Sequence, residues 1–281
     1  MADGPSTGAP PPELLERARA LRDGTHVPAP ARDAATVALL RQGPSGPEVH
    51  LVRRQLGMVF GGMHAFPGGS VDRADAAAEL AWAGPSAAEF ARELGCDEPL
   101  ARALVCAAVR ETFEESGVLL AGPWVGGQVT ALADVSTDEW EAERRALEAR
   151  EQSLSDLLRR RGLVLRADLL RPLAHWITPE IEPRRFDTRF FVAEVPAGQV
   201  CREVGGEAAE RLWVRPAAAL EQGLTMLPPT AAALHDLARH PDVTSALHAS
   251  RTIRPVLPKL VVGDDDRVAF LLPGDPGYPE E

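Results

Sequence analysis

The stretch that decides the fold is Arg110-Glu111-Thr112-Phe113-Glu114-Glu115-Ser116-Gly117. Apolar residues at helical spacing precede it and Gly117 ends it, so the pattern predicts a helix over residues 100–116. Glu111, Glu114 and Glu115 then stand at i, i+3 and i+4, which places their carboxylates on one side of that helix. Such a face is either an ordinary solvated surface or a binding site for divalent cations, which relieve the repulsion between neighbouring carboxylates.

A glycine-rich loop comes before this helix. Residues 57–69 are punctuated by glycine and end in Phe66-Pro67-Gly68-Gly69. Because Gly68 and Gly69 carry no Cβ, their backbone groups can approach a phosphate or a metal ion closely. A glycine loop followed by a helix with three carboxylates is therefore a predicted platform for a diphosphate and its metal, with Gly69 as a candidate substrate contact.

Together, the glycine loop and the glutamate helix resemble the Nudix box, G-x5-E-x7-R-E-U-x-E-E-x-G-U. The resemblance implies an α/β fold, the Nudix α/β/α sandwich with a mixed sheet, here with helical insertions. It also implies hydrolysis of a nucleoside diphosphate linked to another moiety, with Mg²⁺ or Mn²⁺ as cofactor. By position, Glu111, Glu114, Glu115 and the Gly68 carbonyl would bind the metal, and Arg110 would orient the carboxylates.

The chain departs from the box at two places. Asp75 stands five residues after Gly69, where the box has glutamate, and an inserted segment separates it from the helix. Asp72 and Asp75 are therefore both candidates for the first acid. The second departure is Thr112, which occupies a position that is normally apolar.

Further motifs resemble one branch of this family, the branch typified by the mammalian peroxisomal Nudix hydrolase 19. The split box, residues 174–179 and residues 183–191 carry this resemblance, and residues 62–69 fit the G-x3-F-P-G-G end of a coenzyme A signature. The branch is associated with coenzyme A and acyl-CoA diphosphatase activity, which makes such a compound the expected substrate. ADP-ribose or a dinucleotide is an alternative, and so is a non-catalytic module that binds a nucleotide or a protein.

Two arginines are candidate substrate contacts on an extended segment. Arg185 and Arg189 share one face of a strand with Asp187. They form either a platform for phosphate or adenine, which guanidinium groups bind and stack on, or a ladder with Asp187 that holds a sheet.

Three other residues are candidates near the glycine loop or before a late strand. Arg53 lies in the loosely matched upstream part of the coenzyme A signature, and His64 lies beside the glycine loop, where a purely structural histidine is the alternative. Glu207 precedes Trp213 and is a candidate general base, as are the glutamates of the box. For Glu207 the alternative is a surface acid on a loop.

Composition limits the partners. The net charge of −11 argues against nucleic acid, because no overall positive field would attract a polyanion. No run approaches the roughly 18 apolar residues of a membrane helix. The three cysteines match neither a disulfide framework nor a zinc site, and the N-terminus lacks a secretory signal. We therefore expect reduced thiols and a cytoplasmic protein without a membrane partner. The sequence does not decide whether the chain forms a homodimer.

The order of elements predicts three parts. Residues 1–33 are a flexible segment rich in Pro and Ala, residues 34–250 are the Nudix domain, and residues 251–281 are a C-terminal hairpin and tail. Insertions are expected near residues 70–98 and 138–161. The second insertion is predicted as one charged helix, a lid or an oligomer contact, in which Glu141 meets Arg145.

Overall fold

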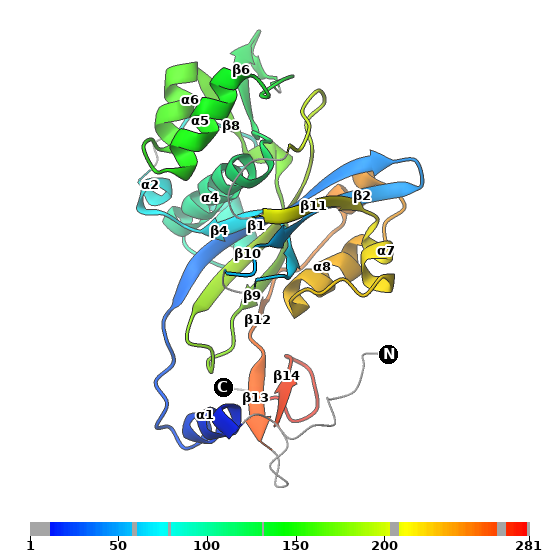
Figure 1. Ribbon diagram of the computed structural model, residues 1–281. Coiled ribbons are helices and arrows are strands. Elements are labelled where there is room, and N and C mark those ends of the chain that lie inside the picture. The colour runs from blue at the N-terminus through cyan, green and yellow to red at the C-terminus, as the bar shows by residue number, and fades with distance from the viewer. Residues whose placement is uncertain are drawn as a thin grey trace. The chain divides into compact units, whose positions relative to one another are not determined.

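The computed structural model describes residues 12–57, 61–77, 80–130, 132–202, 208–262 and 268–279. They form two compact units (Figure 1). The larger unit contains residues 33–174 and 188–254, and the smaller contains the remaining segments, 1–32, 175–187 and 255–281, as far as they are described.

The described part of the chain alternates helices and strands without a regular repeat. The helices are α1 (Pro12–Arg22), α2 (Arg73–Ala76), α3 (Ala87–Leu94), α4 (Glu98–Ser116), α5 (Asp138–Glu148), α6 (Leu154–Arg161), the 3₁₀ turn Ala167–Leu169, α7 (Pro216–Glu221), α8 (Pro228–Leu237) and α9 (Val243–His248). The strands are β1 (Ala31–Gly43), β2 (Gly46–Arg54), β3 (His64–Ala65), β4 (Gly68–Ser70), β5 (Trp82–Ala83), β6 (Ala121–Val125), β7 (Gln128–Val129), β8 (Leu163–Arg166), β9 (Arg171–Ile177), β10 (Arg185–Glu194), β11 (Ala208–Val214), β12 (Pro255–Val256), β13 (Lys259–Val262) and β14 (Val268–Leu271).

The main sheet of the larger unit runs in the order β11-β2-β1-β10-β9. The antiparallel pair β1–β2 is the hairpin that the sequence predicts, with Leu40 opposite Val49. The short strands β3 and β4 pair with β2 and β1. Strands β9 and β10 continue into the residues of the smaller unit, where β12 pairs with β9 in parallel. The sheet is therefore mixed, as expected.

Helices cover both faces of this sheet, which explains why the middle of β1 is largely apolar. Residues 34–40 are all buried. Val37 and Leu39 belong to the core that also contains the apolar side of α4, and the alternation of a strand turns Ala38 and Leu40 to the other face. Figure 1 shows α4 on one side of the sheet and α7 and α8 on the other. This arrangement confirms the predicted α/β sandwich.

Both inserted segments pack against the core beneath α4. Helix α3 contributes Phe90 and Leu94 to that core, and Leu147 and Leu157 of the second insertion are also part of it. A second sheet, β5-β8-β6-β7, joins the two insertions. These segments therefore enlarge the hydrophobic core of the larger unit.

The prediction of one helix over residues 138–161 is wrong. Helix α5 ends at Glu148, and Arg150 has a φ of 58°, a left-handed conformation that a continuous helix does not contain. Ser153 then begins α6, because its side chain accepts a hydrogen bond from the Asp156 amide. The predicted Glu141–Arg145 pair is present, with Nε 3.0 Å from Oε1.

The smaller unit has its own contacts. Ala18 of α1 packs with Ile181 and Leu260 in a small apolar cluster. Strands β13 and β14 form the predicted C-terminal hairpin. Within residues 175–187, the Nε2 of His175 lies 2.5 Å from Oδ1 of Asp187.

Candidate active site

Helix α4 carries the predicted glutamates and is defined at both ends by its sequence. Asp97 caps the first turn by accepting a hydrogen bond from the Leu100 amide at 2.8 Å, so the helix begins slightly earlier than predicted. Gly117 ends it with a φ of 73°, a conformation that favours glycine. A Cβ at Gly117 would also overlap the guanidinium of Arg202. Local sequence thus fixes both ends of the helix.

Arg110 is the centre of the carboxylate cluster. Its Nε donates to both oxygens of Asp75, at 3.1 and 3.2 Å, and its Nη2 donates to Asp75 at 2.9 Å and to the Ser70 carbonyl at 2.9 Å. Its Nη1 donates to Glu111 at 2.8 Å and to Glu114 at 3.4 Å. The guanidinium thus holds three carboxylates from two helices.

Asp75 is the one of the two candidate aspartates that joins this cluster. It lies buried on α2, and it also accepts a hydrogen bond from the Asp72 amide at 2.8 Å, which closes the first turn of that helix. Asp72 instead pairs with Arg150 at 3.3 Å. The shorter aspartate reaches Arg110 because the first insertion places α2 directly beside α4.

The cluster contains more negative charge than Arg110 neutralises. Burial raises the pKa of Glu114 to about 7; the charge of Glu111 adds to the rise and Arg110 opposes it. The pKa of Glu111 is raised as well, first by burial. Burial tends to lower the pKa of Arg110, but its bond with Asp75 and the two glutamate charges outweigh that effect and raise it. A bound cation would reverse the rise at both glutamates.

The glycine loop lies against the same glutamates. Strand β4 pairs with β1, and the Gly68 amide donates a hydrogen bond to Oε2 of Glu115 at 3.0 Å. A Cβ on Gly69 would overlap the carboxylate of Glu111, and one on Gly68 would lie 2.5 Å from the Ala35 carbonyl oxygen. Gly68 therefore requires glycine because backbone atoms approach it closely, whereas at Gly69 the overlapping group is the end of a flexible side chain. The three glutamates share one side of α4, as predicted.

The chemistry of these groups fits a hard divalent cation. Carboxylate oxygens and a backbone carbonyl are the ligands that Mg²⁺ prefers, and Glu111, Glu114, Glu115 and Gly68 supply them. In the described part of the chain, no three His, Cys, Asp or Glu side chains stand arranged as a ready-made metal site. At this cluster, Glu111 and Glu114 instead accept hydrogen bonds from Arg110.

Arg53 and His64 lie opposite each other on β2 and β3. Arg53 is partly exposed, and it contacts Glu210 at 3.6 Å and the Gly62 carbonyl at 3.3 Å. His64 is buried, and its Nδ1 lies 3.2 Å from the Thr225 carbonyl oxygen. This contact is typical of the structural histidine that was the alternative for His64.

The two candidate arginines of β10 have different surroundings. Arg185 belongs to the smaller unit and donates to the carbonyls of Thr178 and Ala29, at 3.0 and 2.8 Å. Arg189 belongs to the larger unit, is buried, and lies 3.9 Å from Asp33. The candidate base Glu207 falls outside the described residues.

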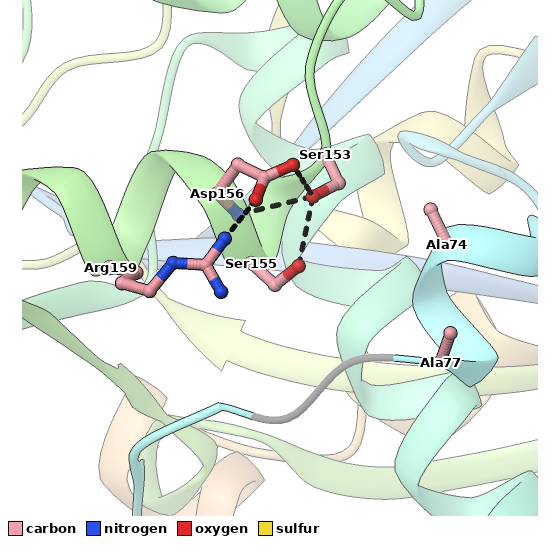
Figure 2. A pocket seen from close by; sticks show the side chains of 6 residues that line it. All are labelled: Ala74, Ala77, Ser153, Ser155, Asp156 and Arg159. Atoms are coloured by element: carbon pink, nitrogen blue, oxygen red, sulfur yellow. Dashed lines mark hydrogen bonds and ion pairs between the residues drawn. The ribbon is translucent and has the colours of Figure 1, made fainter.

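A cavity of about 420 Å³ lies near this cluster but does not contain it. Figure 2 shows its lining residues, which are Ala74, Ala77, Ser153, Ser155, Asp156 and Arg159. The polar side chains bond to one another: Ser153 contacts Ser155 at 2.8 Å and Asp156 at 2.6 Å. None of the predicted site residues lines this cavity. The carboxylate cluster, and not the cavity, contains the residues that the sequence predicts for the site.

Two contacts were not predicted from the sequence. One is the His175–Asp187 pair, which depends on the register of β9 and β10. The other is Arg144, which is buried on α5 and donates to the Glu114 carbonyl at 2.8 Å. Its position three residues after Glu141 was the available signal, but the apolar pattern alone does not show which side of α5 faces α4.

Comparisons with known proteins identify the family. A family model described as the NUDT19 Nudix domain matches residues 83–229, more than half of the chain. Acyl-coenzyme A diphosphatase NUDT19 of Gallus gallus is 29% identical over 270 residues, covering 78% of this chain and 69% of that protein. The protein of the same name from Xenopus laevis is 26% identical over 197 residues, covering 62% of this chain and 50% of that protein.

A solved structure is similar over most of the chain. The crystal structure of a NUDIX hydrolase from Alicyclobacillus acidocaldarius has a TM-score of 0.67 and 32% sequence identity, and the match covers 80% of this chain and 98% of that one. The fold and the site therefore define a Nudix pyrophosphohydrolase, an enzyme class that acts on nucleoside diphosphate derivatives. Within that class, the chain belongs to the family of the NUDT19 Nudix domain. In the part of the chain that is described, no helix has the length and apolar character needed to cross a membrane.

Proposed function

We propose that this enzyme hydrolyses the diphosphate of coenzyme A or of an acyl-CoA, with Mg²⁺ or Mn²⁺ as cofactor. The observation that carries the proposal is the buried cluster around Arg110, where three carboxylates share one guanidinium behind a glycine loop. Similarity to two acyl-coenzyme A diphosphatases supports the choice of substrate. With coenzyme A, the products would be 3′,5′-ADP and 4′-phosphopantetheine.

Each residue of the cluster has a defined part in this proposal. Glu111, Glu114 and Glu115, together with the Gly68 carbonyl, hold the cation. A divalent cation at this place neutralises the diphosphate charge and makes water more acidic. Arg110 fixes the direction of Glu111 and Glu114, which would hold the cation.

The reaction is a displacement by water. The oxygen of a water molecule attacks one phosphorus of the diphosphate, and the bond from that phosphorus to the bridging oxygen breaks. The bridging oxygen keeps the electron pair and leaves as part of the second phosphate. A carboxylate accepts the proton of the water, either a glutamate of α4 or Glu207. Arg53, whose guanidinium is partly exposed beside the glycine loop, contacts the substrate.

A panel of substrates tests the choice. The chain is incubated with coenzyme A, acyl-CoAs, ADP-ribose and a dinucleoside polyphosphate, each with Mg²⁺ or Mn²⁺, and the products are identified by mass spectrometry. We expect coenzyme A compounds to be hydrolysed about tenfold or more faster than ADP-ribose, a difference of about 1.4 kcal/mol in transition-state binding. Preference for ADP-ribose or the dinucleotide would overturn the substrate. Tight binding without turnover would instead indicate a binding module.

The glutamates are tested by removing one charge without changing shape. Glu114→Gln and Glu115→Gln should each lower metal-dependent turnover on the order of 10³-fold, because a metal site supplies several kcal/mol of transition-state stabilisation. Glu143→Gln is the matched control: Glu143 also pairs with arginines, Arg160 and Arg161, but on the inserted helices. Full activity of the Glu114 and Glu115 variants would show that the cluster is not the active site.

A further inference from the structure

The C-terminal end of α4, which carries Glu114 and Glu115, is held by a residue of the second insertion. The last carbonyl groups of a helix have no partner within the helix. At α4, the Glu114 carbonyl accepts a hydrogen bond from Nη1 of Arg144 at 2.8 Å, and the Ser116 carbonyl accepts one from the Arg202 amide at 2.9 Å. The Arg144 side chain is only 1% exposed. The helix end is therefore bonded to an arginine buried in the interface with α5.

Arg144 is itself fixed in one direction by two carboxylates. Both oxygens of Glu141 accept from its Nε and Nη2, at 3.0 and 2.8 Å, and Glu148 accepts from Nη1 at 2.9 Å. Burial tends to lower the pKa of Arg144, but the bonds with Glu141 and Glu148 outweigh it and raise that pKa. The group therefore stays charged, and a cation is favourable at the negative end of a helix.

The insertion also contacts the other helix that meets at Arg110. Arg150, between α5 and α6, lies 3.3 Å from Asp72, the residue before α2. Trp140 of α5 packs edge-on against Phe113 of α4, with ring centroids 6.2 Å apart. Arg150 is largely exposed and contributes little. Beside the contact of Trp140 with Phe113, the buried hydrogen bond of Arg144 thus connects the insertion to the last turn of α4.

We propose that Arg144 is a positioning residue of the active site, which keeps the last turn of α4 in the place where Glu115 meets the glycine loop and Glu114 meets Arg110. The Gly68 amide is 3.0 Å from the Glu115 carboxylate, so a small rotation of that turn separates the two. On this view the second insertion stabilises the metal-binding end of the helix. The inference rests on the proposed metal site for its effect on binding, but not for its effect on the helix end.

The test compares Arg144→Met with Arg145→Met in the full chain. Arg145 lies on the same helix and bonds to the same Glu141, but it is 73% exposed. Three quantities are measured: Mn²⁺ affinity by electron paramagnetic resonance, amide hydrogen exchange of residues 113–118 without metal, and kcat and KM separately. For Arg144→Met we expect about tenfold weaker Mn²⁺ binding. We also expect faster exchange at the helix end and a fall in kcat with little change in KM. The Arg145 variant should match the parent chain.

Further variants keep the test decisive. Arg144→Lys retains the charge but loses the planar fork, so it should resemble Arg144→Met more than the parent. If Arg144→Met does not fold, Glu148→Gln weakens the hold on Arg144 at a partly exposed position and should shift exchange in the same direction. Unchanged exchange and Mn²⁺ affinity in folded Arg144→Met would overturn the proposal. If the parent chain binds no Mn²⁺, the proposed function fails, and exchange alone then decides whether Arg144 holds the helix end.

Discussion

Two buried arginines lie at α4, and the glutamates around them respond in opposite ways. Near Arg110, the pKa of Glu114 rises to about 7, and burial is the main cause. Near Arg144, the pKa of Glu141 is lowered, and its hydrogen bond with Arg144 is the main cause. In both clusters the charged side chains are arginines and carboxylates. Composition therefore does not decide whether such a cluster is a reactive site or a structural contact.

The number of carboxylates for each guanidinium explains the difference. Arg110 serves Asp75, Glu111 and Glu114, all of which are largely buried. Glu141, in contrast, bonds to both Arg144 and Arg145 and reaches solvent. Around Arg110, the free-energy cost of removing the glutamates from water exceeds their attraction to the one guanidinium that they share. Around Arg144, the attraction of Glu141 to its two arginines exceeds that cost. An additional cation would thus stabilise the cluster around Arg110 far more than the one around Arg144.

Removing the guanidinium of Arg110 should give the largest effect on the free energy of unfolding. Arg110→Met leaves Asp75 buried without its guanidinium partner, and breaking a buried pair in this way costs about 3–5 kcal/mol. We expect the free energy of unfolding in urea at pH 7 to fall by that amount. Arg145→Met, at an exposed position, should change it by less than about 1 kcal/mol. Equal losses in the two variants would mean that the buried and exposed arginines do not differ as described.

His50 extends the comparison to a buried base. Burial, and then the positive charges of Arg211 and Arg41, lower its pKa to about 4, while an unfolded chain has about 6.5. The folded state therefore binds fewer protons between these values. The stability from neutral His50 is complete above about pH 6.5 and is lost as the pH falls through about 4.

This shift is measured as a difference between two chains. Urea unfolding of the parent and of His50→Gln is compared at pH 7 and pH 4.5, so that effects of other titrating groups cancel. The parent should lose on the order of 2 kcal/mol more than the variant over this interval. A difference that does not change with pH would show that His50 titrates normally and that burial at this site has no such cost.

The sequence predicted those features that depend on neighbours along the chain. The glutamate face of α4, its stop at Gly117, the β1–β2 hairpin and the C-terminal hairpin all follow from local periodicity and turn residues. The spacing from Gly69 also indicated Asp75 as a candidate for the first acid of the box. The sequence alone does not distinguish Asp75 from Asp72 in this role, because the distinction depends on where the insertion places α2.

Contacts between distant segments could not be predicted. The fixed end of α4 depends on which side of α5 faces it, and a charged residue such as Arg144 gives no sign of being buried. The interruption between α5 and α6 results from the left-handed backbone conformation of Arg150, which the pattern of charged residues does not predict. Thr112, which stands where the Nudix box has an apolar residue, is fully buried. Within the described residues its hydroxyl oxygen has no hydrogen-bond partner.

Gly69→Ala should have the smallest effect on stability. It moves the Glu111 carboxylate without removing its charge, so it tests whether the position of that carboxylate matters. The new Cβ would overlap the Glu111 carboxylate, which is the end of a flexible side chain, so stability should change by less than about 1 kcal/mol. The displaced carboxylate should lower metal-dependent turnover by about 10- to 100-fold, because misplacement of about 1 Å has effects of this size. Gly57→Ala is the control, since nothing lies within 4 Å of a Cβ there. If Gly69→Ala keeps full activity, Glu111 acts only as a partner of Arg110, and the first cluster then resembles the second more closely than its charge indicates.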